Sequence, residues 1–155
     1  MAGFDKYLET MLDRAGAEAR LDGSATVEAR HLLLAIAADQ DSAAGRVLVS
    51  AGLDRSAIRA ALDREFEHSL TAAGVSRSAF GVPPASPDPQ RVPHLGDSIR
   101  LALERAVKSS ARRSPQPAHL LLGILQAEVG TVPRALAMAG VDRADLMARV
   151  AKTLT

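Results

Sequence analysis

The sequence predicts an all-α fold in which two pseudo-twofold-related four-helix repeats are joined by a Pro-rich linker. Three observations support this prediction. The chain is 47% hydrophobic but only 3% aromatic, so its core must be built from Ala, Leu, Val and Ile, a composition that favours closely packed helices. The same helical pattern occurs twice along the chain. Between the two copies, five of the eight prolines fall from Pro83 to Pro93, as expected for a linker of extended character.

The duplication is clearest when the chain is aligned with itself at an offset of 88 residues. Arg30–Leu62 then faces Ala118–Val150 without a gap, and twelve of the 33 aligned pairs are identical. Chance matches in an Ala-rich chain do not produce both a shared H-L-L-L-x-I and a shared A-G-x-D-R at one offset. We conclude that the two halves arose by duplication.

In the first repeat, apolar residues at helical spacing predict an amphipathic helix over residues 4–15. A densely apolar helix is expected from about Val27 to Ala38. A third helix is expected from about Ser42 to Ala51, and it should end at Gly52. Asp54 should cap a fourth helix. The apolar side of that fourth helix would consist of Ile58, Ala61, Leu62 and Phe66.

The pattern of the second repeat predicts four helices in the same order, over Leu95–Ala111, Ala118–Ala127, Val132–Ala139 and Asp142–Leu154. The expected division is a first repeat over residues 1–69, a linker over 70–94 and a second repeat over 95–155. The two repeats should share one core and form one compact domain.

The composition disfavours several classes of protein. A formal net charge of +1 gives no electrostatic reason to expect nucleic acid or an anionic membrane as a partner. The absence of cysteine excludes disulfides, thiolate metal sites and a cysteine nucleophile. No apolar stretch approaches the roughly 20 residues that span a bilayer, and the acidic N-terminal segment does not resemble a signal peptide. We therefore expect a cytoplasmic protein.

His31 and His119 stand at equivalent helix starts, where they suggest either a shared metal site or a structural role. A metal ion usually needs three convergent protein ligands, and neither H-x-x-x-H nor H-E-x-x-H occurs. We therefore predict that each imidazole is structural and satisfies a local backbone carbonyl. His68, at a helix end, and His94, in the linker, suggest no site. We expect no metal and no cofactor.

Catalytic patterns are also missing from the sequence. No G-x-S-x-G nucleophile elbow accompanies the serines, and Asp and Glu are scattered over predicted helix surfaces and caps. The chain is not expected to be an enzyme.

The two H-L-L-L helices, each preceded by a helix and a polar turn, resemble the double Clp-N repeat. The first copy has an aromatic start at Phe4, and Val92 stands at the equivalent place in the second. The double Clp-N repeat is the N-terminal domain of AAA+ unfoldases of the ClpC and ClpA type, and the resemblance runs from Phe4 to about Val150. The sequence contains no G-x-x-x-x-G-K-[ST] phosphate loop. The resemblance therefore implies a free-standing Clp-N domain without ATPase modules, or a piece of a longer chain. It implies binding of clients, adaptors or cyclic-peptide antibiotics, without catalysis.

Two candidate sites follow from the resemblance. The glutamates that help bind phosphoarginine in ClpC-type domains correspond to Arg30 and Ala118, so this binding is expected to be lost or changed. The second site is a groove between the first helices of the two repeats, and its residues could equally serve only to seal the repeats together. The candidate groove residues are Phe4, Leu12, Val92, Asp97 and Leu101.

The leading hypothesis is a non-catalytic protein- and peptide-binding module of the Clp proteolytic system. It would act as a stand-alone adaptor, decoy or sequestering protein, with Clp components, clients or cyclic peptides as partners. The alternative is a small helical regulator outside proteolysis that reuses the same fold.

Overall fold

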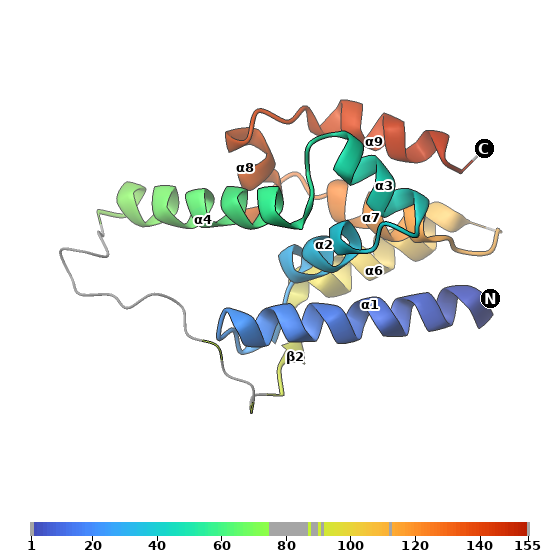
Figure 1. The fold of residues 1–155 in the computed structure, drawn as a ribbon, viewed down its shortest axis with the longest axis horizontal. Helices are drawn as coiled ribbons and strands as arrows, with labels where there is room; N and C mark the ends of the chain where they lie inside the picture. The colour runs from blue at the N-terminus through green and yellow to red at the C-terminus, as the bar shows by residue number, and fades with distance from the viewer. Residues whose placement is uncertain (1, 75–86, 88–89, 91, 112, 155) are drawn as a thin grey trace.

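The computed structural model describes residues 2–74, 87, 90, 92–111 and 113–154. These residues form eight α-helices and one pair of two-residue strands (Figure 1), so the predicted all-α class is confirmed. Most of the predicted linker, namely residues 75–86, 88, 89 and 91, lies outside the described residues.

Each repeat contributes four helices in the same order. The helices of the first repeat are α1 (Ala2–Leu21), α2 (Ala29–Ala38), α3 (Ala43–Ser50) and α4 (Arg55–Ala72). The helices of the second repeat are α6 (Asp97–Ser110), α7 (Pro117–Leu125), α8 (Thr131–Met138) and α9 (Arg143–Lys152). Most helix ends differ from the expected ones by one or two residues, because caps and short strands occupy the residues just outside them. Helix α1 is the exception, since it continues six residues beyond its expected end at residue 15.

The last helix of each repeat begins at an aspartate cap. The Asp54 carboxylate accepts a hydrogen bond from the backbone N–H of Ala57 (2.8 Å), and Asp142 accepts one from Asp145 (3.1 Å). A side-chain acceptor at this position satisfies one of the free N–H groups that every helix start leaves exposed. The cap predicted at Asp54 is confirmed, and it recurs at the equivalent residue of the second repeat.

The third helix of each repeat ends at a left-handed glycine. Gly52 and Gly140 have φ angles of 79° and 75°, which residues with a Cβ rarely adopt. Beyond Gly52, the N–H of Leu53 donates to the carbonyl of Leu48 (2.8 Å), and an equivalent bond closes the second repeat. This is the Schellman ending expected where a helix stops at glycine.

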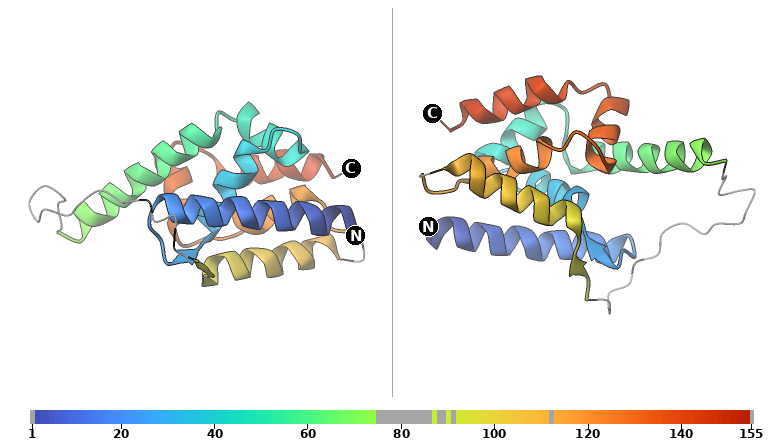
Figure 2. Two further views of the ribbon diagram at one scale, coloured as in Figure 1. Left: turned by 60° about the horizontal axis from the view of Figure 1, so that its bottom comes forward. Right: turned by 180° about the vertical axis from the view of Figure 1, so that it is seen from behind.

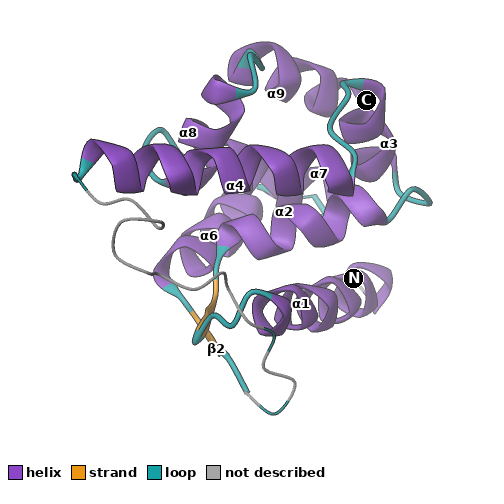
Figure 3. Cartoon of the chain, turned by 60° about the vertical axis from the view of Figure 1, so that its left-hand side comes forward, coloured by secondary structure: helices purple, strands orange, loops and turns teal. Residues whose placement is uncertain are grey.

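The two H-L-L-L helices, α2 and α7, form the centre of the fold (Figure 3). Residues 31–37 and 118–125 are all buried. A helix that is apolar on every side must be covered on every side. Accordingly, α1 packs on α2 and α6 packs on α7, while α3 packs on both central helices and α9 packs on α7.

Helix α4 extends past the expected end of the first repeat. It continues to Ala72, past the expected boundary at residue 69, and its C-terminal half extends away from the other helices (Figures 1 and 2). Ile58, Ala61 and Leu62 are buried as predicted. Phe66 lines a pocket together with Leu62 of the same side, but it lies in the projecting half of the helix and remains 44% exposed.

A short parallel strand pair, which the sequence did not predict, joins the repeats. Strand β1 (Thr26–Val27) pairs with β2 (His94–Leu95), so that Thr26 lies opposite His94 and Val27 opposite Leu95. Two-residue strands carry no periodic signal. His94 was expected at the end of the linker and instead belongs to this pair, and α2 begins after Val27 because β1 occupies that residue.

Two buried carboxylates tie helices together. Glu18 of α1 accepts hydrogen bonds from Arg55 (2.6 Å) and Arg59 (3.0 Å) of α4, and Glu65 of α4 accepts one from Arg134 of α8 (2.8 Å). Burial opposes ionisation of Glu65, but hydrogen bonds from Ser69 and Arg134 outweigh it and lower the pKa of this carboxyl. The Glu65–Arg134 pair therefore links the two repeats.

Candidate peptide-binding surface

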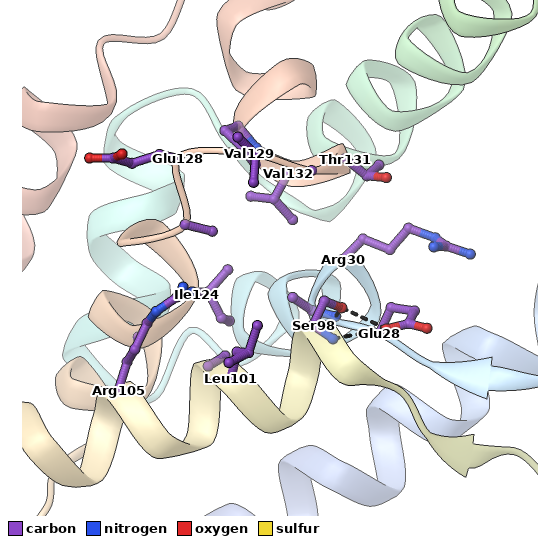
Figure 4. Close-up of a pocket in the computed structure, with 16 residues that line it drawn as sticks. Glu28, Arg30, Ser98, Leu101, Arg105, Ile124, Glu128, Val129, Thr131 and Val132 are labelled. Carbon is purple, nitrogen blue, oxygen red and sulfur yellow. Dashed lines mark hydrogen bonds between the residues drawn. The ribbon is translucent and has the colours of Figure 1, made fainter.

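A pocket of about 370 Å³ opens where the two repeats meet (Figure 4). Its walls come from the start of α2, from α6 and α7, and from residues 127–133, which lead into α8. The pocket therefore exists only when both repeats are folded and docked.

The inner surface of the pocket is apolar. Leu101 of α6, Ile124 of α7 and Val132 of α8 converge on it (Figure 4). Helices α6 and α7 approach closely here because residue 123 is glycine: a Cβ on Gly123 would lie 2.2 Å from the carbonyl oxygen of Ala102. Leu101 is 46% exposed and Val129, on the connecting segment, is 85% exposed. Two accessible apolar side chains therefore flank a packed apolar floor.

One end of the pocket is closed by a hydrogen-bonded joint between the repeats. Glu28, just before α2, accepts hydrogen bonds from the hydroxyls of Ser98 (2.6 Å) and Thr26 (2.7 Å), as Figure 4 shows for Ser98. The Ser98 hydroxyl in turn accepts from the N–H of Ala29 (2.8 Å). Burial would raise the pKa of Glu28, but these bonds outweigh it and lower the pKa. Glu28 is thus an ionised structural group.

Arg30 separates this pocket from a second pocket of about 320 Å³ that lies beside α4. Its guanidinium donates to the Ser24 hydroxyl (3.0 Å) and lies 3.8 Å from an oxygen of Asp22. The arginine that replaces the expected glutamate is therefore held within its own repeat. Ala118, at the equivalent position of the second repeat, is buried in α7 and leaves no polar group there.

Arg105 supplies a cation at the opposite end of the pocket from Arg30. It extends from α6 towards Ile124 (Figure 4), and its guanidinium has no hydrogen-bond or ion-pair partner among the described residues. Glu128 lies on the rim and is exposed. The pocket thus combines an apolar floor with charged groups at its edge, as is typical of peptide-binding grooves.

The structure brings two of the predicted site residues, Arg30 and Leu101, to this pocket, but it places the others elsewhere. Phe4 and Leu12 lie on α1, where Phe4 contacts the ring of Tyr7 (centroid distance 6.3 Å) and Leu12 packs against the core. Val92 and Asp97 do not line this pocket either. Val92 is 80% exposed just before β2, and Asp97 is exposed at the start of α6.

Arg105 and Val129 were missed by the sequence analysis. Arg105 lies four residues after Leu101 and so shares its helix face, which was a usable signal. Val129 carried a weaker one, as an apolar residue in a turn immediately before Gly130.

His31 and His119 each cap a helix start through Nδ1, and their backbone partner is not the carbonyl that the sequence led us to expect. In each case Nδ1 accepts a hydrogen bond from the backbone N–H of the residue before the helix, at 2.9 Å from Glu28 and from Gln116. Helix starts have unpaired N–H groups rather than unpaired carbonyls, so an acceptor is what this position requires.

In the part of the chain that the structure describes, no group of three or more His, Cys, Asp or Glu residues could hold a metal ion. No described helix combines the length and apolar character needed to cross a membrane.

Comparison with known proteins identifies one family. The family model described as the Clp repeat (R) N-terminal domain matches residues 3–111, from α1 through α6. Among curated proteins, none matches the sequence significantly.

Solved structures with a similar fold include the following two. The N-terminal domain of the caseinolytic protease associated chaperone ClpD from Arabidopsis thaliana superimposes with a TM-score of 0.66 at 21% identity, covering 94% of this chain and 93% of that one. A structure from a study of a malarial protein secretion system gives a TM-score of 0.58 at 15% identity, with 92% and 88% covered. At these identities the likeness concerns the fold alone.

Proposed function

Because the chain belongs to the Clp repeat N-terminal domain family, we propose that it is a non-catalytic protein- and peptide-binding module of the Clp proteolytic system. In this proposal it acts as a stand-alone adaptor, decoy or sequestering protein in the cytoplasm. It would hold clients, adaptors or cyclic peptides in place of an unfoldase's own N-terminal domain.

The observation that carries the proposal is the apolar pocket between the repeats. Leu101 and Val129 are exposed beside an apolar floor, and Arg105 adds a cation with no partner among the described residues. A rigid apolar groove with few polar groups at its edge suits an extended or helical peptide segment. A purely structural junction between repeats would not need large apolar side chains exposed at its mouth.

Phosphoarginine recognition is not part of this proposal. A carboxylate suits a guanidinium through paired hydrogen bonds. Arg30 presents the opposite charge and is already bonded to Ser24, and buried Ala118 presents no polar group. Arginine-phosphorylated proteins should therefore not be enriched by this chain.

The test is a crosslinking pull-down from native cytoplasm, with three baits compared by quantitative mass spectrometry. The baits are the wild-type chain, Leu101→Asp, which places a charge in the pocket, and Val107→Asp. Val107 is 63% exposed on the same helix and does not line the pocket, so it is a matched control.

We expect the wild type and Val107→Asp to capture Clp ATPase or adaptor subunits. Leu101→Asp should capture about tenfold fewer, or fewer still, because binding would bury an unpaired charge. If all three baits capture these subunits equally, the pocket is not the binding surface. If none captures any, the role in proteolysis is wrong, and a regulator that reuses the fold becomes the better explanation.

A further inference from the structure

The capping bond fixes which nitrogen of each histidine carries the proton. A backbone N–H can only donate, so Nδ1 of His31 and Nδ1 of His119 must both be unprotonated acceptors. A neutral imidazole then carries its proton on Nε2. Each repeat therefore has an Nε2–H donor on a largely buried ring, and its direction is set by the helix start.

The first repeat satisfies this donor internally. His31 is fully buried, and its Nε2–H donates to a carboxylate oxygen of Asp22 at 2.8 Å. Because the Asp22 carboxylate is ionised, this contact is a charge-assisted hydrogen bond, which is stronger than one between neutral groups.

The second repeat lacks the matching carboxylate. The residue 88 positions after Asp22 is Ser110, whose hydroxyl donates to the carbonyl of Val107 (2.8 Å). His119 is only 4% exposed, and its Nε2 has no hydrogen-bond partner among the described residues. This nitrogen is not one of the buried unpartnered atoms of the described residues, so the Nε2–H keeps access to solvent and is free to donate to a ligand.

An open pocket of about 410 Å³ lies at this position. His119, Ser110 and Arg113 line it together with Gln116. Arg113 is exposed, and its guanidinium has no partner in the described part of the chain. Burial, and then the positive charge of Arg113, lower the pKa of His119, so the ring remains a neutral donor beside a permanent cation. Ala118 does not line this pocket, which is also separate from the one in Figure 4.

We propose that this pocket binds a carboxylate of a peptide partner, which takes the place that Asp22 occupies in the first repeat. The His119 Nε2–H and the Arg113 guanidinium both donate hydrogen bonds to it, and the guanidinium supplies the opposite charge. The peptidic nature of the partner rests on the proposed function, whereas the recognition of a carboxylate rests on His119 and Arg113. The carboxylate belongs either to an acidic side chain or to a chain terminus.

The test is NMR of the histidine rings, with ¹H–¹⁵N correlations that report Nε2 of both His31 and His119 in one spectrum. The probes are N-acetylglycine, which presents a chain-end carboxylate, and acetylated, amidated aspartate, which presents a side-chain carboxylate. Acetylated glycine amide is the uncharged control, and inorganic phosphate tests for unselective anion binding.

We expect the carboxylate probes to shift Nε2 of His119 and to leave Nε2 of His31 unchanged, since Asp22 already occupies it. The tighter of the two probes identifies the source of the carboxylate. Arg113→Ala should weaken binding about tenfold or more, the usual effect of deleting one hydrogen bond to a charged group. Arg100→Ala removes an exposed cation of α6 outside the pocket and should have no effect.

A second variant tests the pocket by supplying the carboxylate from the protein itself. Ser110→Asp installs the missing carboxylate, so Nε2 of His119 should shift without any probe and then ignore the probes. The proposal is overturned if the carboxylates shift neither ring or both rings, if Arg113→Ala binds as well as the wild type, or if phosphate shifts His119 as strongly as the carboxylates.

These outcomes are separate from those of the pull-down. Carboxylate binding at His119 without capture of Clp subunits would leave this site intact and reject the proposed function. If capture of Clp subunits depends on Leu101 but no probe shifts Nε2 of His119, the proposed function stands and the carboxylate site is rejected.

Discussion

The Asp22→Asn variant should be less stable than the wild type at neutral pH and about equally stable near pH 2. Burial alone would raise the pKa of Asp22. Hydrogen bonds from His31 and Ser24, together with the charge of Arg30, outweigh burial and bring this pKa from 3.8 to about 2. The amide of asparagine can still accept the bond from His31 Nε2–H, so the substitution removes the charge and keeps the hydrogen-bond geometry.

The magnitude follows from linkage between protonation and folding. A pKa lowered from 3.8 to about 2 corresponds to roughly 2.5 kcal/mol as an upper limit, at about 1.4 kcal/mol per pH unit. The Asp22 side chain is 18% exposed and partly screened by solvent, so we expect about 1–2 kcal/mol. Because the pKa is lower in the folded state, this contribution is complete above the unfolded pKa and is lost as the pH falls from about 4 to about 2.

Urea unfolding followed by circular dichroism, repeated from pH 7 to pH 2.5, measures this difference directly. Asp13→Asn, at an exposed position of α1, is the control and should stay within about 0.5 kcal/mol of the wild type at each pH. A difference between Asp22→Asn and wild type that stays constant down to pH 2.5 would refute the reasoning. In that case the charge of Asp22 would not be linked to folding.

Two further substitutions test the packing. Gly123→Ala should lower the free energy of unfolding by about 1–3 kcal/mol, because its Cβ would lie 2.2 Å from the Ala102 carbonyl oxygen. Gly16→Ala is the control: its Cβ would meet only a flexible arginine at 3.7 Å, so this substitution should be neutral or stabilising by up to about 1 kcal/mol. Equal effects at the two glycines would contradict the close approach of α6 to α7. The Tyr7 hydroxyl is buried and makes no hydrogen bond of good geometry with a described residue. Burial raises its pKa to about 12 and outweighs the opposite effect of the nearby Ser42 hydroxyl. Tyr7→Phe should therefore raise the thermal midpoint, with a gain on the order of 1 kcal/mol, and a lower midpoint would indicate a bond that this geometry lacks.

The helical part of the fold was predictable because its signals are local or repeated. Apolar spacing, an aspartate cap at Asp54 and a stop at Gly52 each depend on a few neighbouring residues, and the duplication supplied every signal twice. The strand pair could not be predicted in the same way. It depends on Val27 lying beside Leu95 in the folded chain, and neither two-residue segment carries a pattern of its own.

The candidate site was only partly predictable for the same reason. Register within the repeat located Leu101 and Arg30 but not their neighbours. The pocket is completed by residues 127–133, whose position depends on how α8 docks against α4. The role of Glu28 was also hidden, because its hydrogen bond to Ser98 joins residues 70 positions apart.

The two repeats keep the same helix starts, but equivalent polar side chains have different partners. The comparison distinguishes side chains that have an internal partner in both repeats from those that have one in only one repeat. Arg55 and Arg143 are equivalent residues, yet Arg55 bonds to the carboxylate of Glu18 and Arg143 to the backbone carbonyl of Leu125. A partner that helps the fold can be replaced by another internal partner, as happens for this pair. The Nε2–H of His119 has received no internal replacement, although its ring still caps α7. A donor that keeps access to solvent and has no internal acceptor can bind an outside group without any rearrangement of the ring. The carboxylate site that we propose therefore belongs to the second repeat and has no counterpart in the first, where Asp22 already accepts this bond.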